Sequence, residues 1–203
     1  MTIKTVSHDT LMLYFEQEIS QSVLDEVQKI YLSLKSLKGI IDITPSYCSI
    51  LVQYDILIYN EKALKERIIQ TAVGLASADE IPNNKLIKIP TNYSKNLDLK
   101  RVAQHNKLSR EEVIELHTKT TYRVYTIGFM VGFAYLATVD TKIATPRLES
   151  PRKKVPKGSV ALADTQTAIY PQDSAGGWNI IGHTEFNDFQ SFKIGDKVQF
   201  ERI

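Results

Sequence analysis

The sequence predicts an α+β protein in two parts: alternating strands and helices first, and a region rich in strands after them. Seven of the nine glycines and four of the seven prolines lie after residue 127, a density of turn residues typical of all-β regions. Before about residue 90, apolar residues instead form short runs or recur at three- and four-residue spacing. A length of 203 residues allows two small domains, each with a core of its own.

The N-terminal elements follow one another as strand, helix, strand, strand, helix and strand. We expect strands at 11–15, 40–44, 47–54 and 86–89, with helices at 23–37 and 61–76. Gly39 ends the first helix, and the Pro45-Ser46 turn separates the middle strands. The order β-α-β-β-α-β is the ferredoxin-like pattern, so we expect an α/β sandwich domain over residues 1–92.

A pair of helices is expected to open the second domain, residues 93–203. The first covers 98–106, and Ser109 with Glu112 forms a capping box for the second. A DNA-binding helix-turn-helix is the alternative interpretation. Glu111, Glu112 and Glu115 would face the duplex in that case and repel it, so the sequence favours packed helices.

Charge and composition exclude several classes of protein. The net charge is +2, which argues against a nucleic-acid or polybasic membrane binder. The least polar window, 125–139, is too short to span a bilayer, and the first residues lack the apolar stretch of a signal peptide, so we expect a cytoplasmic protein. The single cysteine, Cys48, is expected to be a buried strand residue rather than a catalytic thiol, and no spacing predicts a metal site.

A loop braced by proline is the clearest candidate for anion binding. Residues 145–158 carry five cations and one anion, with prolines at 146, 151 and 156. The rigid backbone should present Arg147 and Arg152 for bidentate capture of a carboxylate or phosphate. A solvated basic loop is the alternative.

Other candidates surround this loop in the sequence. The segment 128–136 interleaves glycine with aromatic residues and predicts either a core strand and bend or the wall of a pocket. The backbone N–H groups of Gly176 and Gly177 are suited to an anion, while Trp178 is either a core anchor or a pocket residue. His183 is a titratable group beside Thr184, although a single histidine is more often structural. Neither a P-loop nor a Gly-x-Ser-x-Gly elbow occurs.

Several of these motifs occur together in the order of one known family. They are Gly128-Phe129, Gly132-Phe133-Ala134-Tyr135-Leu136, Pro146-Arg147, Pro151-Arg152, Gln166, Ile169-Tyr170-Pro171, Gly176-Gly177-Trp178, Ile181-Gly182 and Thr184. The sequence resembles the family of 5-oxoprolinase B subunits, which includes the kinase inhibitor KipI and allophanate hydrolase subunit 1 (carboxyltransferase C/D) domains. The resemblance begins near residue 10 and is strongest over 109–203, and His117 matches the family's helix-terminal histidine.

The resemblance implies a ferredoxin-like domain followed by a cyclophilin-like β-barrel. It also implies an ATP-dependent opening of 5-oxo-L-proline to L-glutamate, with ATP and Mg²⁺, by a hetero-oligomer with C and A subunits in which this chain is not active alone. Such a site must neutralise phosphate and carboxylate charge. The candidate binding residues are Arg147, Arg152, Gln166, Tyr170, Gly176, Gly177, Trp178 and Thr184, and the candidate acid–base residues are His117 and His183.

Two other functions stay open at this point. The chain is either a regulator that binds a sensor histidine kinase without chemistry, or a carboxyltransferase module of the urea/allophanate type that works with biotin. All three functions use the same expected fold.

Overall fold

The computed structural model describes residues 1–76 and 84–203, which form two compact units divided after residue 83. The sequence predicted a boundary after residue 92. The boundary lies earlier because β5 (Leu86–Thr91) pairs in parallel with β13 (Lys197–Arg202) of the second unit. Within the described ranges, none of the helices combines the length and hydropathy of a membrane span.

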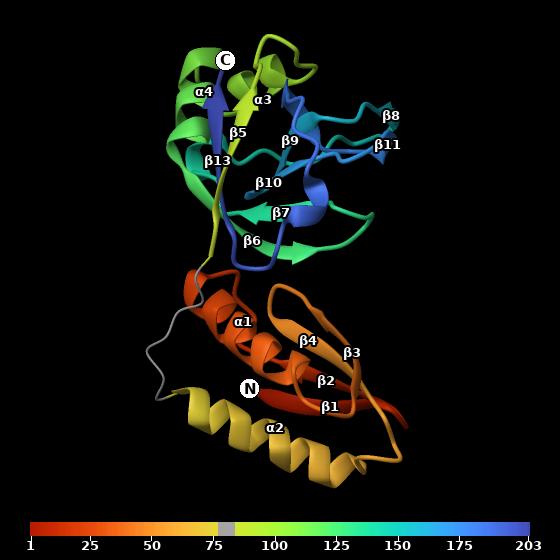
Figure 1. Cartoon of the computed structure of the whole chain (residues 1–203). Helices are drawn as coiled ribbons and strands as arrows, with labels where there is room; N and C mark the ends of the chain where they lie inside the picture. The colour runs from red at the N-terminus through yellow and green to blue at the C-terminus, as the bar shows by residue number, and fades with distance from the viewer. Residues whose placement is uncertain (77–83) are drawn as a thin grey trace. The chain divides into compact units, whose positions relative to one another are not determined.

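The first unit is a four-stranded antiparallel sheet with two helices (Figure 1). The strand order is β1-β2-β4-β3. The strands are β1 (Thr2–Ser7), β2 (Thr10–Tyr14), β3 (Ile40–Pro45) and β4 (Ser49–Tyr54), and the helices are α1 (Gln21–Lys35) and α2 (Glu61–Ala76). The α1 face that carries Leu24, Val27 and Leu34 is buried, as its spacing predicts.

The predicted ferredoxin-like order is wrong at both ends of this unit. The strand at 86–89 belongs to the other unit, and β1, which the sequence analysis missed, forms a hairpin with β2. Five of the six β1 residues are exposed, so this edge strand lacks the apolar alternation of a half-buried strand. The prediction for Cys48 is also corrected, since it lies half-buried in the turn before β4 and its thiol donates to Glu18 O (3.3 Å).

The second unit is built on a seven-stranded sheet that nearly closes into a barrel. The strand order is β12-β9-β10-β7-β6-β13-β5, and a bridge between Asn92, just after β5, and His183 of β12 joins the two edges. The remaining strands of this sheet are β6 (Thr121–Ile127), β7 (Ala134–Ala137), β9 (Ser159–Ala163), β10 (Gln166–Ile169) and β12 (Asn179–His183). The density of turn residues in this region therefore predicted a sheet, but it did not predict that the sheet nearly closes into a barrel.

Helices α3 (Leu99–His105) and α4 (Arg110–Lys119) pack against each other and against the sheet, α3 on β12 and α4 on β13. The capping box is confirmed: the Ser109 hydroxyl accepts from Glu112 N, and the Glu112 carboxylate accepts from Ser109 N. These contacts confirm a packed pair of helices.

A two-stranded ribbon of β8 (Arg152–Val155) and β11 (Ser174–Gly176) projects from this unit at the end away from α4 (Figure 1). It carries Arg152 and Gly176 as cross-strand partners. The ribbon thus brings the proline-braced loop beside the glycine pair, which the sequence places about 25 residues apart.

Candidate functional site

The predicted anion-binding loop forms one wall of a cavity of about 250 Å³ in the second unit, which we call the aromatic pocket. Arg147 is the charged residue in its lining. The other lining residues are Phe129, Phe133, Tyr135, Pro151, Tyr170, Ala175, Gly176, Gly177 and Trp178. The structure therefore brings together five of the predicted binding residues, namely Arg147, Tyr170, Gly176, Gly177 and Trp178.

Phe133 is the centre of the pocket's aromatic cluster. Its ring meets Tyr135, Tyr170 and Trp178 edge to face, with centroids 4.8, 5.3 and 5.8 Å away. Such arrangements favour fixed ring positions. The three rings of Phe133, Tyr170 and Trp178 are nearly inaccessible to solvent, so Trp178 is both a core anchor and a pocket residue.

The Arg147 guanidinium lies over the Trp178 ring, 5.7 Å from its centroid, in cation–π geometry. Hydrogen bonds hold the loop backbone around it: Leu148 N donates to Gly177 O (2.7 Å), and Pro146 O accepts from Asn179 Nδ2 (3.1 Å) and from Arg101 (3.2 Å). The guanidinium is therefore held in place at the pocket while its donors stay available to a ligand.

Tyr170 lies so close to Gly176 that a residue with a side chain does not fit at position 176. A Cβ on Gly176 would lie 2.2 Å from the Tyr170 hydroxyl. Burial raises the pKa of Tyr170, although a hydrogen bond with the Trp178 backbone and the charge of Arg147 act in the opposite direction. Tyr170 is therefore a neutral O–H group at the pocket near neutral pH.

Arg152 lies outside the pocket lining, contrary to its predicted pairing with Arg147. It forms an ion pair with Asp98 at the start of α3, with Arg152 Nη2 2.6 Å from Asp98 Oδ1. The other Asp98 oxygen accepts from Ile180 N (2.7 Å). Asp98 is buried, so this pair ties the ribbon to α3 and β12.

His117, one of the two candidate acid–base residues, is a fully buried core residue in the structure. Its Nδ1 lies 2.7 Å from the Tyr93 hydroxyl and its Nε2 lies 2.9 Å from Thr167 Oγ1. Because Thr167 donates its own proton to Ala161 O (2.9 Å), Nε2–H must donate to Thr167 and Nδ1 must accept from Tyr93. Burial lowers the pKa of His117 from 6.5 to about 3, so the imidazole stays neutral.

The remaining predicted site residues lie apart from the aromatic pocket. His183 lines a second cavity of about 270 Å³ together with residues 94–97. Thr184 is buried and donates to Pro90 O (2.6 Å), which is a structural contact. Gln166 begins β10 and lines neither cavity. The structure thus separates the two predicted histidines from Arg147.

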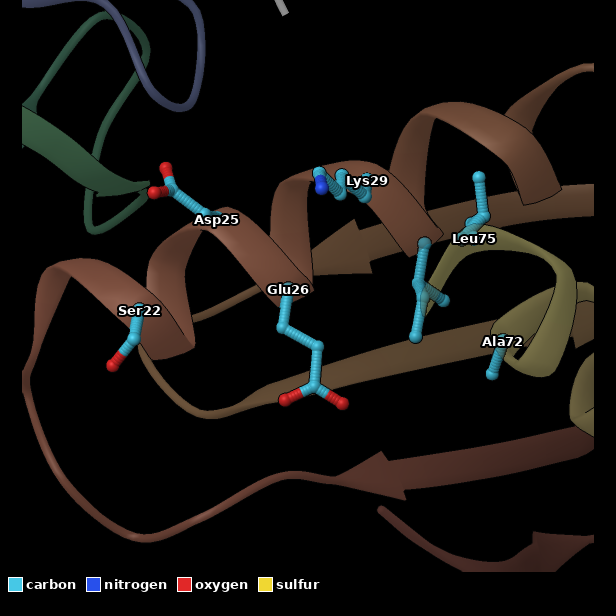
Figure 2. Close-up of a pocket in the computed structure, with 7 residues that line it drawn as sticks. Ser22, Asp25, Glu26, Lys29, Ala72 and Leu75 are labelled. Atoms are coloured by element: carbon cyan, nitrogen blue, oxygen red, sulfur yellow. The ribbon is translucent and has the colours of Figure 1, made fainter. Parts of the chain in front are cut away.

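A third cavity, of about 250 Å³, lies between α1 and α2 in the first unit (Figure 2). Ser22, Asp25, Glu26 and Lys29 of α1 line it together with Ala72 and Leu75 of α2. Figure 2 shows the Asp25 and Glu26 carboxylates pointing in different directions, so they do not converge on one ligand. Two carboxylates disfavour an anionic substrate here.

Sequence reasoning left 128–136 undecided between core and pocket wall, and the structure shows both. Phe133 is core, whereas Phe129, at the turn between β6 and β7, is 66% exposed and lines the pocket. Phe129 has a φ of +69°, an unusual conformation for an aromatic residue. Among the described residues, no cluster of His, Cys, Asp and Glu has the geometry of a metal site.

A family model described as "Carboxyltransferase domain, subdomain C and D" matches residues 1–195. The chain belongs to this family. Three curated relatives between 32% and 39% identical carry the name of the B subunit of 5-oxoprolinase. The relative from Bacillus subtilis is 32% identical over 99% of this chain and 92% of its own length.

Two solved structures share the fold of this chain. TTHA0988 superposes with a TM-score of 0.83 at 30% identity over 96% of this chain, which spans 40% of that longer chain. The urea carboxylase of Kluyveromyces lactis superposes with a TM-score of 0.71 over 99% of this chain and 21% of its own. At 14% identity, the second likeness shows a shared fold alone.

Proposed function

We propose that this chain is the B-type component of an ATP-dependent 5-oxoprolinase and that its aromatic pocket binds 5-oxo-L-proline. The observation that carries the proposal is Arg147, held over Trp178 at a cavity whose walls are otherwise aromatic and small residues. The names of the relatives, one of them similar over nearly the whole chain, supply the substrate.

The chemistry of 5-oxoproline suits these walls. Its carboxylate is a bidentate partner for the Arg147 guanidinium, and its ring methylenes fit against aromatic faces. The Tyr170 hydroxyl, kept neutral by burial, is available as a hydrogen-bond donor to the lactam oxygen. A volume of about 250 Å³ suits a molecule of amino-acid size, since drug-sized ligands occupy roughly 300–1,000 Å³.

The described residues do not fit ATP and Mg²⁺ in the same way. The two cavities described in the second unit measure about 250 and 270 Å³, and the described part of the chain contains no metal-binding cluster. We therefore assign the nucleotide and its metal ion to partner subunits, the C and A subunits that the resemblance implies. Because the nucleotide and its metal ion then bind to other subunits, we expect this chain to be inactive alone.

The test is to co-purify the chain with its C-type partner, add the A subunit, and measure glutamate release from 5-oxoproline with and without ATP. We expect release only when all subunits and ATP are present. Arg147→Gln should raise KM at least tenfold, because a charge-assisted contact contributes about 1.5–3 kcal/mol.

Lys153→Gln is the matched control, since it removes the same charge from an exposed position six residues away and should change KM less than twofold. Equal effects of the two substitutions would contradict the assignment of the pocket. Full activity without any partner would contradict the division of labour.

A further inference from the structure

Phe129 combines two features that are unfavourable in the free protein. The residue is 66% exposed, whereas Phe133, whose ring it meets edge to face with centroids 5.5 Å apart, is buried. Its φ of +69° lies in the left-handed region, which is disfavoured for a residue with a bulky side chain. Water on an aromatic ring costs free energy as well. Unfavourable conformations of this kind concentrate at sites that bind ligands.

The turn that carries Phe129 is held in place at both of its ends. Gly128 N donates a hydrogen bond to Phe133 O at 3.1 Å, which closes the turn. Gly132, with a φ of +81°, packs so closely on the buried Phe189 that a Cβ on the glycine would lie 2.7 Å from the Phe189 Cβ. The backbone therefore fixes where the Phe129 ring starts, although the ring itself faces solvent.

The place where the turn holds this ring is the aromatic pocket. Phe129 is the most exposed of the aromatic residues that line the pocket, since Phe133, Tyr170 and Trp178 are buried. Val131 belongs to the same turn and is 77% exposed, yet it does not line the pocket. Exposure on this turn thus does not by itself bring a side chain to the pocket, whereas the backbone conformation at Phe129 does.

We propose that Phe129 is a substrate-binding residue that covers the ligand in the aromatic pocket and packs against its apolar part. The inference rests on the function proposed above and deepens it: Arg147 binds the carboxylate of 5-oxo-L-proline, and the Phe129 ring packs on the ring methylenes. Burial of the ring by the ligand offsets the cost of exposing it. The fixed turn places the ring before the ligand arrives, which lowers the entropy cost of binding.

The test compares Phe129→Asn with Val131→Asn in the assembled enzyme. Asparagine tolerates the left-handed conformation, so Phe129→Asn removes the ring without adding strain. We expect its KM for 5-oxo-L-proline to rise about five- to tenfold while kcat changes less than about twofold, because the ring contributes to binding alone. Val131→Asn makes the same change from apolar to polar two residues away and should alter neither constant.

Two further measurements separate ligand binding from a structural role. The melting temperature of the free chain should change by less than about 3 °C in both asparagine variants, because largely exposed side chains contribute little to stability. Phe129→Tyr keeps the ring and should retain a KM within about twofold of the wild type. Size-exclusion chromatography should show that each variant still forms the complex with the C-type partner.

The possible outcomes distinguish this inference from the function on which it rests. If Arg147→Gln raises KM and Phe129→Asn does not, the role of Phe129 is overturned and the function of the pocket stands. If neither substitution raises KM, both proposals are overturned. An equal rise in KM for Val131→Asn would show a general effect of the turn, and loss of the complex in Phe129→Asn would show that the ring binds the partner subunit. Either result overturns the inference.

Discussion

The interior of the barrel unit and the rim of its aromatic pocket use the same residue types in different ways. Arg147 and Arg152 both follow a proline in one loop, yet Arg147 faces a pocket while Arg152 is bound to the buried carboxylate of Asp98. His117 and His183 differ similarly, since both nitrogens of His117 are bonded inside the core. The role of each of these side chains therefore depends on the partners that the fold places beside it. Residue type and position in the sequence do not determine that role.

The largest effect should come from breaking the interior ion pair. Arg152→Met leaves the buried Asp98 carboxylate without its cation, and we expect the free energy of unfolding to fall by about 3 kcal/mol, as for other buried pairs that lose one partner. Arg147→Met should change it by less than about 0.5 kcal/mol, because the guanidinium faces the pocket. Urea unfolding of both variants measures the contrast.

The double variant Arg152→Met with Asp98→Asn sharpens this test. Asparagine keeps an oxygen for Ile180 N–H without a buried charge, so part of the lost stability should return. If Arg147→Met destabilises the protein as much as Arg152→Met does, the distinction between interior and rim is wrong.

The interior histidine should make stability depend on pH. Burial lowers the pKa of His117 from 6.5 to about 3, so between these values the unfolded chain binds a proton that the folded chain does not. The stability that the neutral, buried His117 contributes is therefore complete above pH 6.5 and is lost as the pH falls toward 3. We expect a loss of about 2 kcal/mol between pH 6.5 and 4.5, from 1.36 kcal/mol per pKa unit.

His117→Gln removes this titration, so comparing its urea unfolding with that of the wild type over pH 4.5–7.5 isolates the histidine from the carboxylates. The difference in stability between the two proteins should shrink as the pH falls. A constant difference across this range would show that His117 titrates alike in the folded and unfolded chains.

The smallest expected effect is the difference in stability between alanine substitutions at the two neighbouring glycines of the pocket. Gly176→Ala places a Cβ 2.2 Å from the Tyr170 hydroxyl, so the ring must move, and we expect a loss of roughly 1–2 kcal/mol together with weaker ligand binding. A Cβ at Gly177 would meet Pro151 at 3.6 Å and Leu148 O at 3.8 Å, which are ordinary contacts, so Gly177→Ala should be tolerated. Thermal unfolding of both variants decides it, and equal melting temperatures would contradict the close approach.

Local patterns in the sequence predicted local structure well. The α2 helix has the bounds that its periodicity predicts, and the capping box of α4 forms with both of its bonds. Strand pairing was less predictable, because an apolar run such as β5 shows that a strand exists without showing its partner. β1 was missed because its polar residues give no alternation signal.

The sequence predicted which residues belong to the candidate site better than it predicted how they are arranged in space. Arg147, Tyr170 and Trp178 were chosen from proline bracing and motif order, and the structure places them around one cavity. Nothing in the sequence near Arg152 indicated Asp98, which lies 54 residues earlier and meets it only through the fold.

The pairing of β5 with β13 also governs how this chain can assemble during synthesis. The two strands are 111 residues apart in register, whereas the strands of the first unit pair over much shorter separations. The first unit can therefore fold while the second is still being translated. Until residues 197–202 leave the ribosome, β5 lacks its only neighbour in the order of the described sheet. An unpaired strand edge is prone to aberrant pairing, and β5 carries such an edge for as long as its partner strand is still being made.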